Sequence, residues 1–392
     1  MNVDQPSEGP DEQVVLVGSN PLPLFRSVCT VQPPVVVLVH STGTEEPARR
    51  LEDAIKVTVG SHVRRVALAS PWAAQEVGSA CESVLTKRSW LDYTGGTKVM
   101  AAHARIALDR VVGDAAAAAR RASYVHEAQQ VLQFDDGTVL KLAPVPSLGN
   151  LLGLHGIKVL TQRTGQEDED DARYPGARDA WEVARATIRD LDVLTDLHKA
   201  LHSLSPTTLA RQPVPLPRAL HGLRVQRIPD SGDWDVDCVA RWRAFLTGGW
   251  LEQLFSDALR QAAPDASVAM NVHCVRGGRE FEVDAVALHH GRLYVGSCAT
   301  RPSITTVKEK SFELALRARQ MGGDLGRGAV VTLLAGDDQK TSSPRVDAVQ
   351  ADLDELWGGP NRMLVRGRDH IARWSEGDVT DLADWMSVGH HS

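Results

Sequence analysis

Short apolar runs alternate with helix-compatible segments in the first 145 residues of the chain. Valine-rich runs occupy residues 13–19, 33–41 and 62–70, and each is followed by a segment that can form a helix. Continuous apolar strands that alternate with helices are typical of a parallel sheet covered on both faces. A further strand is predicted at 88–96, and a hairpin at 131–142 with a tight Asp-Gly turn. This part of the chain therefore predicts an open α/β domain.

The pattern changes after residue 146. A helix is predicted around 177–203, and the prolines that follow it between 206 and 217 are incompatible with a regular helix interior. From residue 236 helices and strands mix in an order that suits a second α/β domain with a mixed sheet. The predicted elements of this last part are helix 239–261, strands 279–288 and 292–298, helix 307–322, strand 328–336, helix 345–357, strand 362–367 and a final helix. The domains are thus expected at 1–146, 147–235 (a connector) and 236–392.

The composition argues against a membrane-spanning, secreted or disulfide-rich protein. The 392 residues are 43% hydrophobic and 24% charged, and no stretch approaches the roughly 20 apolar residues of a membrane span. The polar start lacks the features of a signal peptide, so we expect a cytoplasmic protein without a membrane partner. Five scattered cysteines without CxxC spacing argue against a disulfide framework or a structural zinc site. A net charge of −7 means that any phosphate or nucleic-acid binding needs a local basic patch.

The stretch DYTGGTKVM at 92–100 closes a strand and opens a helix. Gly95 and Gly96 let a ligand approach the backbone, Thr97 can cap the helix, and Lys98 adds a positive charge to its first turn. The exposed amides and the dipole of a helix start favour phosphate. The order of these residues is neither a Walker A loop nor a GxGxxG turn.

A second loop, at 17–23, follows the first strand. Ser19 and Asn20 in this loop could contact a base or a ribose. Open α/β sheets bind ligands where the carboxyl ends of such strands converge. We therefore expect one nucleotide site built from both loops.

The stretch 92–100 resembles the signature of CARF domains, the CRISPR-associated Rossmann-fold sensors of cyclic oligoadenylates, and loop 17–23 matches their second ligand-contacting element. A CARF domain, a helical connector, the GGWLE segment at 248–252 and a PD-(D/E)xK domain, in this order, is similar to the CARF endonucleases of type III CRISPR systems. The resemblance implies a Rossmann-like sensor followed by a restriction-endonuclease-like domain, with a role in antiviral defence. It also implies a homodimer that holds one cyclic tetra-adenylate (cA4) across its two-fold interface. The implied contact residues are Ser19, Asn20, Thr94, Gly95, Gly96, Thr97 and Lys98.

PD-(D/E)xK nucleases hold Mg²⁺ or Mn²⁺ between carboxylates, and a lysine steadies the attacking water or the developing charge. The resemblance makes Glu252 the helix acid and Asp284 the central metal ligand. Glu282 lies two residues before Asp284 on the same strand face, so it could also reach the metal. The family pattern expects an acid and a lysine on the next strand, where Ser297 and Ala299 stand instead.

Two hypotheses follow from these replacements. The favoured one is a cyclic-oligoadenylate sensor whose nuclease-fold domain no longer cuts and acts by binding or assembly. The alternative is a ligand-activated endonuclease on DNA or RNA in which Lys308 or Lys310, at the start of the next helix, replaces the missing lysine.

The adjacent pair His289-His290 falls in a predicted hairpin turn. Neighbouring positions on a strand point in opposite directions, so the pair is predicted to be exposed and to suit a metal poorly.

Overall fold

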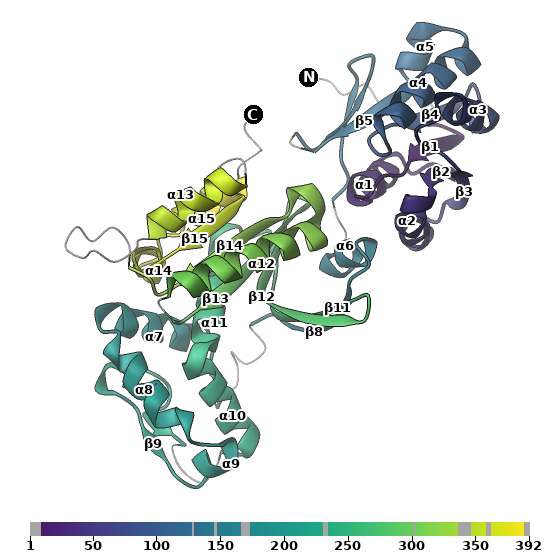
Figure 1. The fold of residues 1–392 in the computed structure, drawn as a ribbon. Coiled ribbons are helices and arrows are strands. Elements are labelled where there is room, and N and C mark those ends of the chain that lie inside the picture. Colours follow the sequence, from purple (N-terminus) through teal and green to yellow (C-terminus); the bar gives the residue numbers. More distant parts are fainter. Residues whose placement is uncertain are drawn as a thin grey trace. The chain divides into compact units, whose positions relative to one another are not determined.

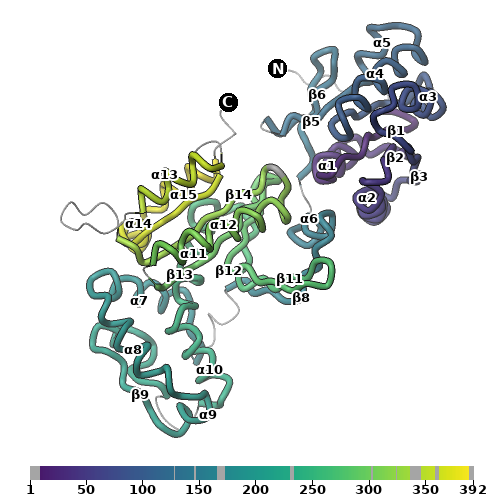
Figure 2. The backbone as a smooth tube through the Cα atoms, in the orientation of Figure 1, coloured from purple at the N-terminus to yellow at the C-terminus, as the bar shows by residue number. Residues whose placement is uncertain are grey.

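The computed structural model describes residues 9–127, 129–144, 147–165, 173–229, 234–301, 303–335, 346–357 and 362–387 (Figures 1 and 2). It divides into two compact units: unit 1 runs to Lys158 and unit 2 begins at Val159. The segment 147–235, expected as a separate connector, is therefore shared between the units.

Unit 1 is built on a seven-stranded sheet. Its strands, in spatial order, are β3 (His62–Leu68), β2 (Val35–Ser41), β1 (Glu12–Leu16), β4 (Ser89–Asp92), β5 (Ala122–His126), β6 (Val131–Phe134) and β7 (Val139–Lys141). The strands from β3 to β5 are parallel, and β6 and β7 add an antiparallel hairpin. The chain runs from β1 outwards to β3 and then returns to place β4 on the other side of β1, so the strand order reverses between β1 and β4.

Helices cover both faces of this sheet. The helices of unit 1 are α1 (Leu22–Val31), α2 (Glu45–Thr58), α3 (Ala74–Val84), α4 (Lys98–Val112), α5 (Ala115–Ala119) and α6 (Leu148–Leu154), of which α6 packs against α2. Figure 1 shows α1 and α2 on one side and α3 and α4 on the other. The fully buried Val14, Leu16, Val37 and Val39 alternate along the two central strands and pack in one core cluster. The predicted doubly covered, Rossmann-like sheet is confirmed.

Unit 2 is built on a six-stranded mixed sheet. Its strands, in spatial order, are β15 (Met363–Arg366), β14 (Arg327–Thr332), β13 (Arg292–Ala299), β12 (Arg279–His289), β11 (Ser267–Arg276) and β8 (Lys158–Arg163). The strands β11, β12 and β13 are antiparallel neighbours, whereas β13, β14 and β15 run parallel. A separate small ribbon joins β9 (Val214–Pro215) to β10 (Arg227–Ile228).

The helices of unit 2 are α7 (Ala177–Arg189), α8 (Asp192–His202), α9 (Pro206–Leu209), α10 (Val236–Ala244), α11 (Trp250–Ala262), α12 (Ile304–Gly322), α13 (Val346–Leu356), α14 (Arg368–Ser375) and α15 (Thr380–Ser387). Two predicted helices are each divided. The helix expected at 239–261 breaks at Gly248-Gly249, where a π turn joins α10 to α11, and the one expected at 177–203 breaks after Arg189. The helix α9 begins directly at Pro206, because the first turn of a helix needs no amide donor.

The helices α11 and α12 pack on opposite faces of the unit 2 sheet. A Cβ on Gly296 would lie 2.2 Å from Phe255 of α11, whereas a Cβ on Gly322 of α12 would lie 2.8 Å from the side chain of Leu293. Residues 293 and 296 are an odd number of positions apart on β13, so they face opposite ways. The site described below receives side chains from both helices as well as from the sheet.

None of the helices that the structure describes could cross a membrane, given their length and polarity.

Candidate functional sites

The two glycine-containing loops of unit 1 meet where the strand order reverses. The strands β1 and β4 are parallel neighbours, so the loops at their carboxyl ends lie together. A Cβ on Gly95 would lie 2.2 Å from the carbonyl oxygen of Leu16 and 2.9 Å from the amide of Gly18. Gly96 has a φ of 79°, which side chains rarely adopt. Gly95 is thus required by the contact between the loops and Gly96 by its backbone conformation, whatever ligand binds there.

Thr97 and Asn20 fix the helices that begin at this edge. The Thr97 hydroxyl accepts a hydrogen bond from the amide of Met100 at 3.1 Å and donates one to the carbonyl of Pro71 at 2.9 Å. The side-chain oxygen of Asn20 accepts from the amide of Leu22 at 3.2 Å, at the start of α1. These two side chains therefore hold helix starts in position, with their amides at the edge of the sheet.

Thr94 is tied to a buried acid. The amide of Thr94 donates to Asp92 at 2.9 Å, and the hydroxyl of Thr94 accepts from the amide of Val125 at 2.8 Å. Complete burial raises the pKa of Asp92, while hydrogen bonds from Ser27 and Thr94 act in the opposite direction. Of the seven predicted ligand contacts, Ser19, Gly96 and Lys98 are exposed.

In unit 2 the structure brings three of the predicted residues together. The Oδ2 atom of Asp284 accepts hydrogen bonds from the amide of Cys298 at 2.6 Å and from the hydroxyl of Ser297 at 3.1 Å. The ammonium of Lys310 donates to the same Ser297 hydroxyl at 3.0 Å. Lysine, serine and aspartate thus form one hydrogen-bonded chain from α12 to β12. Ala299 is 5% exposed and offers no polar side-chain atom.

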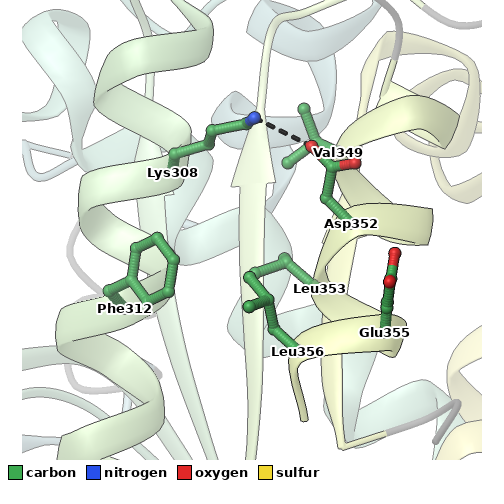
Figure 3. Close-up of a pocket in the computed structure, with 7 residues that line it drawn as sticks. All are labelled: Lys308, Phe312, Val349, Asp352, Leu353, Glu355 and Leu356. Atoms are coloured by element: carbon green, nitrogen blue, oxygen red, sulfur yellow. Dashed lines mark hydrogen bonds and ion pairs between the residues drawn. The ribbon is translucent and has the colours of Figure 1, made fainter. Parts of the chain in front are cut away.

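Lys308 lies elsewhere. Two helical positions are about 200° apart around the axis, so Lys308 and Lys310 point to different sides of α12. The Lys308 ammonium pairs with Asp352 of α13 at 2.8 Å, at the edge of a hollow of about 550 Å³ that Phe312 and Leu356 also line (Figure 3). Of the two lysines, only Lys310 joins the hydrogen-bonded chain that leads to Asp284.

Glu252, in the first turn of α11, completes the acidic group. Its Oε2 atom accepts a hydrogen bond from the side-chain amide of Asn271 at 2.8 Å. Burial raises the pKa of Glu252 to about 7; the neighbouring Asp284 and Glu282 add to this effect, whereas Asn271 and Lys310 oppose it. Carboxylate oxygens are the ligands that a hard divalent cation prefers, so the chemistry of Glu252, Asp284 and Glu282 fits Mg²⁺ or Mn²⁺.

A hollow of about 460 Å³ lies beside these acids. Glu252 and Glu282 line it on one side, and the basic residues Arg163, Arg241 and His273 contribute to its wall. Glu282 is within 3.3 Å of the His273 ring. The hollow therefore combines acids that suit a cation with basic groups that suit phosphate.

Solved structures supply the comparison for this arrangement. No protein-family model matches the chain, and no curated protein sequence matches it. Can2 from Sulfobacillus thermosulfidooxidans, whose structure is a complex with cyclic tetra-adenylate, aligns with a TM-score of 0.68 at 18% identity, over 96% of this chain and 99% of Can2. The chain has the fold of Can2. The predicted fold class, a Rossmann-like α/β unit followed by a second α/β unit with a mixed sheet, is thereby confirmed.

Two further structures are similar to the chain. Protein VC1899 from Vibrio cholerae aligns with a TM-score of 0.66 at 14% identity, over 97% of this chain and 99% of VC1899. A type III CRISPR defence DNA nuclease activated by cyclic oligoadenylate aligns with a TM-score of 0.53 at 22% identity, over 83% of this chain but 46% of that nuclease. Both likenesses concern the fold.

Within this Can2 fold, two residues that lie near the sites were not predicted from the sequence as site residues. Trp72 is 68% exposed and follows Pro71, whose carbonyl is bound by Thr97 of the ligand loop. The available signal in the sequence was a tryptophan directly after the proline that follows the predicted strand 62–70. Asn271 had no such signal, because β11 itself was not predicted.

Proposed function

We propose that the chain is a cyclic-oligoadenylate-activated, metal-dependent nuclease of type III CRISPR defence in which Lys310 takes the place of the lysine missing at Ala299. The observation that carries this proposal is the chain from Lys310 through Ser297 to Asp284. A lysine on a solvated helix face would point into water, whereas the Lys310 ammonium donates to the hydroxyl that in turn binds the Asp284 carboxylate. This geometry favours the moved lysine over the loss of chemistry that the sequence alone favoured.

The proposed activating ligand is cA4, bound by the two loops of unit 1. Support comes from the exposed Ser19 and Lys98 at the reversal point of the strand order, and from the cA4 complex of Can2. A cyclic tetra-adenylate has two-fold symmetry, so a homodimer would offer it two helix starts and two copies of Lys98. The site thus supplies a local positive charge within a chain of net charge −7.

The metal ion would be held by Glu252 and Asp284, with Glu282 close by. When bound, Mg²⁺ or Mn²⁺ makes a coordinated water more acidic and offsets the charge that develops on the phosphate. The Asp284 carboxylate is held in one orientation by the Cys298 amide and the Ser297 hydroxyl. Lys310 carries a positive charge next to them, where it can bind a phosphate oxygen or stabilise a hydroxide. Glu252 must release its proton before it can bind a cation.

The test compares two lysines on one helix. Purified wild type, Lys310→Ala and Lys308→Ala are incubated with labelled DNA and RNA, single- and double-stranded, with Mn²⁺ and with or without cA4. We expect ligand-dependent cleavage by wild type and by Lys308→Ala, and a loss of about 10²- to 10⁴-fold in Lys310→Ala. Equal rates in the two variants would refute the role of Lys310.

A second candidate function rests on a specific observation. Ser297 is neutral and Ala299 is buried, so the family's acid and lysine positions are both filled by residues without charge. A sensor that binds cA4 and acts through nucleic-acid binding or assembly would keep the nuclease fold without needing charged residues at positions 297 and 299. It predicts intact cA4 binding with no cleavage of any substrate, and cleavage that is lost in Asp284→Ala would exclude it.

A further inference from the structure

Three side chains that the proposed nuclease site does not use meet at the turn between β12 and β13. The Asp265 Oδ1 atom lies 3.1 Å from Nε2 of His289, and its Oδ2 atom lies 3.5 Å from Nε2 of His290. One ligand atom from each of the three residues lies within 4.8 Å of the other two. We call this group the turn site.

The strand register explains why these residues meet. Ser267 of β11 pairs with Leu288 of β12, so the residues just before Ser267 lie opposite the end of β12. His290 and Gly291 form the turn itself, with φ values of 47° and 75°. A two-residue turn with two positive φ values is the type I′ turn that joins antiparallel strands.

The expectation that adjacent histidines point apart is wrong at this position. It holds for two residues within a strand, but His290 has left the strand and adopts the left-handed conformation. The two imidazole rings consequently lie with their centroids 4.0 Å apart. Both rings face Asp265, which comes from a different segment of the chain.

We propose that the turn site binds one divalent transition metal ion of the zinc class. Zinc bound tetrahedrally by imidazole nitrogen and carboxylate oxygen, with bonds of about 2.0 to 2.1 Å, places neighbouring ligand atoms about 3.3 Å apart. The Nε2 atom of His289 lies 3.1 Å from Oδ1 of Asp265 and that of His290 lies 3.5 Å from Oδ2 of the same carboxylate, on either side of that value. Two nitrogen donors and one oxygen donor suit zinc, nickel or copper better than magnesium.

The setting of the three side chains fits a site that is both anchored and accessible. The His289 side chain is only 10% exposed, which holds one ligand in place, whereas those of His290 and Asp265 are 50% and 64% exposed. The open side leaves room for water or a further ligand to complete the coordination. A bound ion would fasten the loop before β11 to the β12–β13 turn.

The turn site is separate from the proposed nuclease centre. Asp284 and His289 are five positions apart along the extended strand β12, which corresponds to about 17 Å. A metal ion at one place therefore shares no ligand with the other. The two proposals can be tested independently.

The experiment uses the full-length chain in a background that removes competing zinc ligands. Asp284→Asn weakens the nuclease centre, and His390→Ala with His391→Ala removes two terminal histidines that lie outside the described residues. Metal-free protein is titrated with Zn²⁺ by calorimetry, and Co²⁺ is added separately to record the visible absorption of a tetrahedral site. We expect one Zn²⁺ per chain and a rise in the melting temperature when Zn²⁺ is added.

The decisive variant is His290→Asn in the same background. Asparagine suits the type I′ turn, so the variant keeps the hairpin while it removes one imidazole. We expect its zinc affinity to fall at least about tenfold, and the same for Asp265→Asn, because each removes a direct ligand. His273→Ala, a histidine outside the turn site, serves as the matched control and should bind zinc as the background does. Equal zinc affinity in His290→Asn and the background, or no zinc binding by the background, would overturn the proposal.

Discussion

Replacing Glu252 by glutamine should stabilise the metal-free protein at high pH and have little effect at low pH. Burial, aided by Asp284 and Glu282, raises the pKa of Glu252 from 4.5 to about 7 in the folded chain. The neutral form is thus favoured by folding. The contribution of the Glu252 carboxyl to the free energy of unfolding is fully present below pH 4.5 and is lost as the pH rises through 7. Glutamine stays neutral throughout and can still accept the hydrogen bond of Asn271.

The size of the effect follows from the pKa difference. Each pKa unit corresponds to about 1.4 kcal/mol, so the full loss of stability in the wild type is about 3.5 kcal/mol. Part of this loss has already occurred at pH 5. Between pH 5 and pH 8 the stability of wild type should therefore fall by roughly 2 to 3 kcal/mol relative to Glu252→Gln.

Urea unfolding in EDTA, followed by tryptophan fluorescence, measures this difference. All of the nine tryptophans except Trp72 and Trp90 belong to unit 2, so the signal reports mainly on the unit that contains Glu252. Glu280→Gln, an exposed change on β12, is the control and should follow the wild type. Parallel pH dependence in wild type and Glu252→Gln would refute the raised pKa of Glu252. Addition of Mn²⁺ at pH 8 should stabilise wild type more than Glu252→Gln, because the cation offsets the same repulsion.

Three further predictions concern unit 1. Lys98→Ala should weaken cA4 binding about tenfold in calorimetry, since it removes a charged contact at the helix start, and unchanged affinity would exclude Lys98 from the site. Trp72→Ala should weaken cA4 binding roughly 5- to 100-fold if the exposed indole stacks on adenine, while Trp72→Phe should retain most of the affinity. Gly95→Ala should lower the melting temperature, because its Cβ would lie 2.2 Å from the Leu16 carbonyl oxygen. Gly78→Ala in α3, where a Cβ meets nothing within 4 Å, is its control and should not destabilise the chain.

The sequence predicted most of the fold because the central strands are continuous apolar runs. The strand cores at 13–19, 33–41 and 62–70 were placed correctly, and β1 and β4 carry the two loops that were expected to meet. The strands β8 and β11 were missed. Their exposed positions hold polar residues such as Lys158 and His273, and their side chains do not alternate cleanly between apolar and polar. Pairing within the sheet, rather than local propensity, decides their conformation.

The choice between Lys308 and Lys310 could not be made from the sequence. It depends on which side of α12 faces the sheet, and the helix begins at Ile304, three residues earlier than predicted. The ligand loops of unit 1 were easier to predict from the sequence, since glycines and a capping threonine indicate a tight turn before a helix. The turn site could not be predicted, because it depends on the left-handed backbone conformation of His290, which the spacing of residues in the sequence does not reveal.

The bond from the Cys298 amide to Asp284 has a consequence for how such sites vary between proteins. A backbone amide is present in every residue except proline, so the orientation of Asp284 does not depend on the side chain at position 298. Substitutions there can tune the packing against α11 while the acid keeps its direction. A search that compares side chains alone would overlook this anchor, whereas a comparison of main-chain hydrogen bonds would recover it.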